Sequence, residues 1–157
     1  AASPRRLRHP PRLAAPAQLS LGSVNVRVSI GDHGRDDPAR ANDMLLYEIE
    51  AGGAIIYHVG DNANLDKMTP TRPIDWYIFH ISVGLPVVES IRKVDARLAL
   101  ASHVLELGHS RFPPHAWRWS YDFAYERIAS IEADRAEVPA WGERFESPGA
   151  EWTRGER

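Results

Sequence analysis

Apolar and polar residues alternate along the first half of the chain in the way that half-buried β-strands require. The segment VNVRVSI (24–30) repeats with a period of two, the pattern of a strand that turns one face to a core. Two further apolar runs, MLLYEIE (44–50) and AIIYHV (54–59), are separated by Gly52-Gly53. Paired glycines between apolar runs favour a tight hairpin turn. We therefore predict a first strand and, after a polar loop, a β-hairpin.

Strands and helices alternate in the second half. WYIFHIS (76–82) is rich in aromatic and β-branched residues, as strands are. Pro86 suits the first turn of a helix that runs to Val94, and a short buried strand over 98–101 follows this helix. Apolar residues recur at helical spacing over 117–131, which predicts a closing amphipathic helix. The order predicts an α/β domain of the layered α+β kind, with about five to six strands and two to three helices.

The two ends of the chain differ in composition from its middle. Residues 1–20 are rich in arginine and proline and contain no acidic residue, so we expect a disordered leader there. Residues 132–157 are acidic and interrupted by proline and glycine, and we expect a flexible tail. The folded domain is therefore predicted to span 21–131. Nucleic-acid binding by the arginine-rich leader is a minor alternative, and we do not expect it.

Composition excludes several classes of protein. The net charge of −2 favours neither nucleic acid nor an anionic membrane surface as a partner. The chain has no cysteine, so disulfides, thiolate zinc sites and cysteine nucleophiles are excluded, and His, Asp and Glu remain as strong metal ligands. No apolar run approaches the roughly 20 residues that cross a bilayer. The head has no apolar region typical of a secretory signal, and we expect a cytoplasmic location.

Three residues that can bind metals stand directly after apolar strands. They are His33, Asp61 and His103. Strand ends in layered α/β folds open into a common crevice, so these side chains can converge although they lie far apart in the sequence. Two imidazoles and a carboxylate are a suitable ligand set for zinc, manganese or iron. The alternatives are that Asp61 caps a short helix and that the two histidines are ordinary surface residues.

Two segments carry a resemblance to a known family. GGAIIYHVGDN and ARLALASHVLELGH, followed by AWRWSYDFAYERI, resemble the second half of metallo-β-lactamase-fold hydrolases. The resemblance implies part of an αββα sandwich over about 22–131. It implies that Asp61 bridges two metal ions, that His103 is the last histidine ligand and that His33 is the middle one. Glu106 and His109 would orient the ligands, or else form a polar, exposed helix start.

The remaining histidines have structural interpretations. His58 and His80 lie inside predicted strands between apolar neighbours, and we interpret them as core histidines. His115 stands at the start of the closing helix, where a capping role explains it. No residue is identified as catalytic.

The histidine-rich motif that begins the family's metal site, H-x-H-x-D-H, is missing from this sequence. We therefore expect a truncated metal-dependent hydrolase, weakly active or inactive alone, acting on a small molecule that the sequence does not identify. Zinc is the expected ion, with manganese or iron as alternatives and with low occupancy. The other hypothesis is a non-catalytic binding or scaffold module derived from this fold. An incomplete sandwich leaves an apolar face and a sheet edge open, so we also expect self-association or pairing with another chain.

Overall fold

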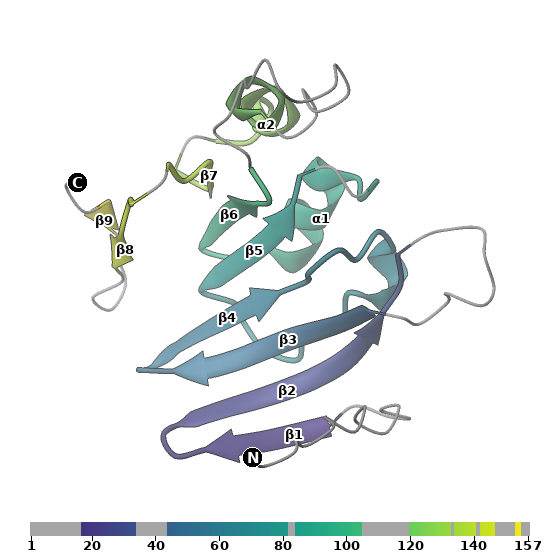
Figure 1. The fold of residues 1–157 in the computed structure, drawn as a ribbon, viewed down its shortest axis with the longest axis vertical. Coiled ribbons are helices and arrows are strands. Elements are labelled where there is room, and N and C mark those ends of the chain that lie inside the picture. The colour runs from purple at the N-terminus through teal and green to yellow at the C-terminus, as the bar shows by residue number, and fades with distance from the viewer. Residues whose placement is uncertain are drawn as a thin grey trace, which may run out of the picture.

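One sheet of seven strands runs through the described part of the chain, in the order β1-β2-β3-β4-β5-β6-β7 (Figure 1). The structure is a computed structural model that describes residues 17–33, 44–81, 84–104, 120–132, 134–140, 142–146 and 153–154. The strands are β1 (Ala17–Leu21), β2 (Val24–Gly31), β3 (Met44–Ala51), β4 (Ala54–His58), β5 (Trp76–His80), β6 (Leu98–Ser102) and β7 (Ala136–Glu137). A separate two-stranded sheet pairs β8 (Phe145–Glu146) with β9 (Thr153–Arg154).

The sheet has an antiparallel half and a parallel half. Strands β1 to β4 form an antiparallel meander, and β4 to β7 run parallel to one another. The turn between β3 and β4 is the predicted hairpin, with φ of 58° at Gly52 and 83° at Gly53, a conformation that glycine adopts without steric cost. Because β4, β5 and β6 are parallel, their carboxyl ends lie along the same edge of the sheet.

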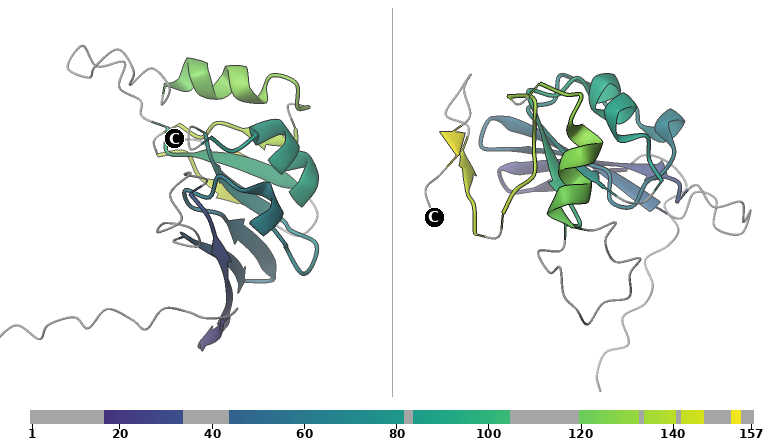
Figure 2. Two further views of the ribbon diagram at one scale, coloured as in Figure 1. Left: turned by 90° about the vertical axis from the view of Figure 1, so that its right-hand side faces the viewer. Right: turned by 90° about the horizontal axis from the view of Figure 1, so that it is seen from above.

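Helices connect the parallel strands. A short 3₁₀ helix, η2 (Leu65–Lys67), lies between β4 and β5; α1 (Val87–Val94) links β5 to β6, and α2 (Tyr121–Ile128) links β6 to β7. The two α-helices contact each other (Figure 2). No helix within the described ranges is long and apolar enough to cross a membrane.

The main core lies between these helices and one face of the sheet. Tyr57, Tyr77 and Phe79 are fully buried on this face. The Tyr77 hydroxyl and Ser90 Oγ of α1 are 3.1 Å apart, and Ser90 in turn donates to the carbonyl of Val87 at 2.7 Å. These contacts place α1 against β5, and the pKa of Tyr77 is raised by burial.

The opposite face of the sheet is also apolar. The register pairs Val26 with Ile49, Ile49 with Ile56 and Ile56 with Trp76, and directly paired residues share a face. All four are only partly buried. On the edge strand β1, Leu19 belongs to the same face and is 52% exposed. On the same face, Val28, Leu98 and Leu100 are buried. We call this second apolar face of the sheet, on the side away from α1, the open face.

A buried carboxylate holds the loop before β5 against β3. Glu48 is 1% exposed, and its carboxylate accepts hydrogen bonds from the Thr71 amide (2.9 Å), the Thr71 hydroxyl (2.7 Å) and Arg72 Nε (3.1 Å). Arg27 lies 3.7 Å away. Burial raises the pKa of Glu48, but the hydrogen bonds from Thr71 and Arg72 and the charge of Arg27 outweigh it, so the pKa is lowered overall.

The sheet has more strands than the five to six that the sequence predicts. Strand β1 begins at Ala17, inside the predicted leader 1–20, and β7 lies inside the predicted tail 132–157, where Ala136 and Val138 are buried. β1 lies at the end of the arginine- and proline-rich segment that predicted a leader, and the two-residue β7 is too short to show a period. Pairing with β2 and β6 makes both of them strands. The closing helix begins at Tyr121, where the Ser120 side chain caps it.

Candidate functional site

Asp61, His80 and His103 lie at the carboxyl ends of three neighbouring parallel strands. Asp61 follows β4, His80 is the last residue of β5 and His103 follows β6 (Figure 1). His33 reaches the same edge from the end of β2, in the antiparallel half. This edge is where layered α/β proteins gather their functional side chains.

The Asp61 carboxylate lies between two imidazoles. Its Oδ2 is 3.5 Å from His33 Nε2, and its Oδ1 is 3.6 Å from His80 Nε2. The His80 side chain is 7% exposed and that of His33 22%, whereas the Asp61 side chain is 45% exposed. The site is therefore walled by histidines and open to solvent at the carboxylate.

His103 joins this group through its ring. The imidazoles of His80 and His103 stack with centroids 4.2 Å apart and planes inclined by 23°. His103 has a φ of 63°, a left-handed conformation that is uncommon for residues other than glycine. Such backbone strain is concentrated at functional sites, because the rest of the fold must hold it in place.

A buried asparagine sets the position of His33. Asn62 is fully buried, and its Oδ1 accepts from the Asp32 amide at 2.9 Å, while its Nδ2 donates to the Asn64 carbonyl at 2.9 Å. The Ala63 amide donates to the Asp32 carbonyl at 2.8 Å. A Cβ at Gly31 would lie 2.9 Å from Asn62 Oδ1, so glycine is needed there for this close approach. The loop that carries His33 is thus bound to the loop that carries Asp61.

The helix cap near Asp61 is a different residue. Asn64 is the N-cap of η2, and its side chain accepts from the Asp66 amide at 2.9 Å. The interpretation of Asp61 as a cap is therefore not needed, and its carboxylate faces the two histidines.

His58 supports the turn that precedes Asp61. Its Nδ1 accepts from the Gly60 amide at 3.0 Å, and Gly60 has a φ of 52°. Burial lowers the pKa of His58, and the charge of Asp61 opposes this effect. A histidine whose folded pKa lies below its ordinary value of 6.5 stabilises the fold fully above that value, and this contribution is lost as pH falls through the folded pKa.

The structure brings two of the three predicted site residues together and places a further histidine, His80, beside them. His33 and Asp61 are adjacent, and His103 contacts the site through His80. His80 is buried, in keeping with its interpretation as a core histidine, yet it also faces Asp61. The signal that could have identified it is its place at the end of the strand next to that of Asp61. Glu106, His109 and His115 lie outside the described residues.

The described residues do not form a complete metal site. Among them, no three His, Asp or Glu side chains are already arranged so that they could hold one ion. The arrangement is instead two histidine–carboxylate pairs that share Asp61. An imidazole and a carboxylate are donors that suit zinc, manganese and iron.

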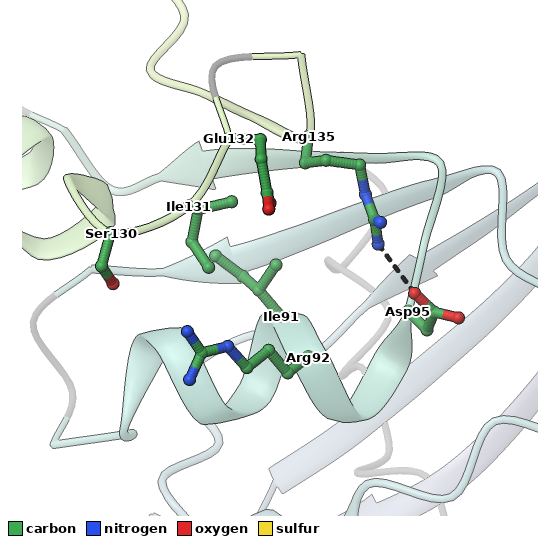
Figure 3. A pocket seen from close by; sticks show the side chains of 7 residues that line it. All are labelled: Ile91, Arg92, Asp95, Ser130, Ile131, Glu132 and Arg135. Atoms are coloured by element: carbon green, nitrogen blue, oxygen red, sulfur yellow. Dashed lines mark hydrogen bonds and ion pairs between the residues drawn. The ribbon is translucent and has the colours of Figure 1, made fainter.

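A small hollow of about 230 Å³ lies elsewhere, beside α1 and the end of α2 (Figure 3). Arg135 donates to Asp95 at 2.7 Å across it, and Ile91, Ile131 and Glu132 also line it. Asp95 precedes β6, so this hollow is at the opposite edge of the sheet from His103. It contains none of the residues of the histidine cluster.

Solved structures with a similar fold are metal-dependent hydrolases. A possible metal-dependent hydrolase from Veillonella parvula has a TM-score of 0.56 and 16% identity, with 80% of this chain and 55% of that one covered. A candidate Zn-dependent hydrolase of the metallo-β-lactamase superfamily from Thermotoga maritima has a TM-score of 0.52 and 12% identity. The match covers 77% of this chain and 59% of that one. A metallo hydrolase from the archaeon Ignicoccus hospitalis has a TM-score of 0.50 and 14% identity. The match covers 94% of this chain and 60% of that one. No protein-family model matches the sequence, and no curated protein matches it.

These likenesses show the fold. The mixed sheet with two α-helices is an α+β arrangement consistent with the metallo-β-lactamase fold, and the predicted resemblance to that fold is confirmed. The chain spans a little over half the length of these structures.

Proposed function

We propose that this chain carries part of the metal site of a metal-dependent hydrolase, with Asp61, His33 and His103 as ligands. One observation carries the proposal: the Asp61 carboxylate lies within 3.6 Å of the imidazoles of His33, which follows β2, and of His80, which ends β5. The proposed ligands and His80 meet at one edge of the sheet: His33, Asp61 and His103 follow β2, β4 and β6, and His80 ends β5. The fold shared with metal-dependent hydrolases supports the same function.

The donor set fits a divalent ion of borderline hardness. With no cysteine in the chain, nitrogen and oxygen are the only strong donors, and zinc accepts both at about 2.0–2.2 Å. We propose zinc, with manganese or iron as alternatives. A bound ion of this kind lowers the pKa of a coordinated water to near neutrality and polarises the bond to be broken.

The chain's own residues have separable roles in such a site. Asp61 supplies negative charge at a half-exposed position, and His33 is held opposite it by the Asn62 hydrogen bonds. The sequence contains no H-x-H-x-D-H motif that could add further ligands. We therefore propose weak metal occupancy and little hydrolysis by this chain alone.

Metal binding and turnover by the purified chain test this proposal. After removal of bound metal with a chelator, isothermal titration with Zn²⁺ and Co²⁺ should show saturable binding that EDTA reverses. Hydrolysis of ester, thioester and phosphodiester substrates should stay near background. Tight stoichiometric zinc with a turnover near the ~10 s⁻¹ of ordinary enzymes would contradict the proposed weak activity. No saturable binding would contradict the metal site itself.

A non-catalytic binding or scaffold module is the second candidate. The observation in its favour is that the described residues contain no preformed group of three metal ligands. Under this alternative, alanine at Asp61 or at His103 changes neither metal content nor fold.

We further propose that the open face is an interface to a second apolar sheet of another chain. Towards the β1 edge of this face Leu19 is exposed and Val26 is partly buried, and exposed apolar side chains that lie together mark interaction sites. Without that partner, copies of the chain should associate with one another, because each presents the same face.

Size-exclusion chromatography with light scattering over a range of concentrations measures this association. We expect Val26→Lys, on the open face, to shift the chain towards monomer. Asn25→Lys is the matched control, since the neighbouring position on β2 points to the other side and is exposed. A wild-type chain that stays monomeric at every concentration would contradict the interface.

A further inference from the structure

We infer that His80 is a metal ligand, and that an ion at this site is bound by His80 Nε2 together with Oδ1 of Asp61. The inference rests on the proposed function and adds a ligand to it. The ligand class is a single divalent cation of borderline hardness, such as Zn²⁺ or Co²⁺. His80 approaches Asp61 from β5, whereas the two predicted histidine ligands, His33 and His103, follow β2 and β6.

The distance between the two donors favours coordination over a direct hydrogen bond. His80 Nε2 and Asp61 Oδ1 are 3.6 Å apart, beyond the range of about 2.7–3.2 Å for a nitrogen–oxygen hydrogen bond. Two donors at about 2.05 Å from one tetrahedral zinc ion lie about 3.3 Å apart. The observed separation is therefore close to that of two ligands on a shared ion.

The His80 ring is held in this orientation by its neighbours. It stacks on His103 at 4.2 Å, and β5 and β6 are in register there, with His80 opposite Ser102. Ser102 Oγ donates to the Phe79 carbonyl at 2.8 Å, which fixes the two strand ends to each other. A ligand held in place in this way loses little rotamer freedom when an ion binds.

The other histidine inside a strand shows the contrast. His58 lies on β4, but its Nδ1 is used as the acceptor for the Gly60 amide. Within the described residues, the imidazoles at ion-pair distance from the Asp61 carboxylate are those of His33 and His80. His80 is thus the histidine that the Asp61 Oδ1 faces, while Oδ2 faces His33.

Nitrogen NMR of the wild-type chain labelled with ¹⁵N-histidine tests the inference directly, with Zn²⁺ as the titrant. Coordination replaces any proton on Nε2, so the His80 Nε2 resonance should shift and show no one-bond coupling to hydrogen. The His33 Nε2 resonance should respond as well, and the His58 resonances should stay where they are. The variants His80→Asn and His33→Asn assign the signals by the resonance that each one removes.

The possible outcomes separate this inference from the proposed function. If His33 responds while His80 Nε2 keeps its proton, His80 only orients Asp61 and the inference is overturned, but the metal site stands. If no histidine responds, the chain binds no zinc and both fail.

A second measurement uses His80→Gln, whose amide is polar and can donate a hydrogen bond but is a poor metal ligand. We expect it to lose the Co²⁺ absorption bands of the wild-type complex and at least tenfold in Co²⁺ affinity. A Co²⁺ spectrum and affinity equal to those of the wild type would overturn the inference.

Discussion

Replacing Asp61 by asparagine is expected to weaken Co²⁺ and Zn²⁺ binding by more than about 100-fold. Residues that merely orient a ligand already cost about 10- to 100-fold when they are replaced, and Asp61 is proposed as the ligand itself. Asparagine preserves size and one oxygen but removes the charge that both His33 and His80 face. The effect should appear in titration calorimetry and in the intensity of the Co²⁺ absorption bands.

The control for this variant is Asp66→Asn. Asp66 is an exposed residue of η2. Its backbone amide donates to the Asn64 side chain that caps η2, and its carboxylate is not part of the histidine cluster. We expect its metal affinity to match that of the wild type. Both variants should retain the far-ultraviolet circular dichroism of the wild type. Equal Co²⁺ affinity in Asp61→Asn and wild type would rule out Asp61 as a ligand and favour the scaffold alternative.

Replacing Glu48 by glutamine is expected to lower the free energy of unfolding by about 2 kcal/mol. Breaking a fully buried ion pair costs about 3–5 kcal/mol, and the value here should be lower because Arg72 is 40% exposed and stays hydrated. The loss arises because an amide nitrogen would replace an oxygen that now accepts from Thr71 or Arg72. Urea unfolding at pH 7, with equal m-values for both proteins, measures it.

The lowered pKa of Glu48 predicts how the stability lost in Glu48→Gln depends on pH. Because the folded pKa of Glu48 is lowered, its contribution is fully present above the ordinary value of 4.5 and is lost as pH falls through the folded pKa. The difference between wild type and Glu48→Gln should therefore shrink in acid.

Glu50→Gln is the matched control on the same strand. Glu50 also pairs with Arg72, at 3.1 Å, but its side chain is 41% exposed, and such surface pairs contribute about 0–1 kcal/mol. Similar losses in the two variants would show that burial of Glu48 is not the cause.

Much of the fold follows from local pattern. The period of two in β2, the glycine pair between β3 and β4 and the aromatic β5 are properties of short segments, and each one became the predicted element. The same holds for α1, which needs only an apolar stripe and a proline at its start. Very short strands such as β7 carry no such pattern, because their neighbours in the sheet make them strands.

The candidate site was likewise predictable from the sequence only in part. The sequence by itself determined that Asp61 and His103 follow strands and that nitrogen and oxygen are the available donors. Only the tertiary structure decided that His33 faces Asp61, since this depends on hydrogen bonds of Asn62 across two loops. It also decided the place of His80, because parallel pairing of β4 with β5 and of β5 with β6 puts one strand end between the other two. Strand order is a long-range property, and no local period records it.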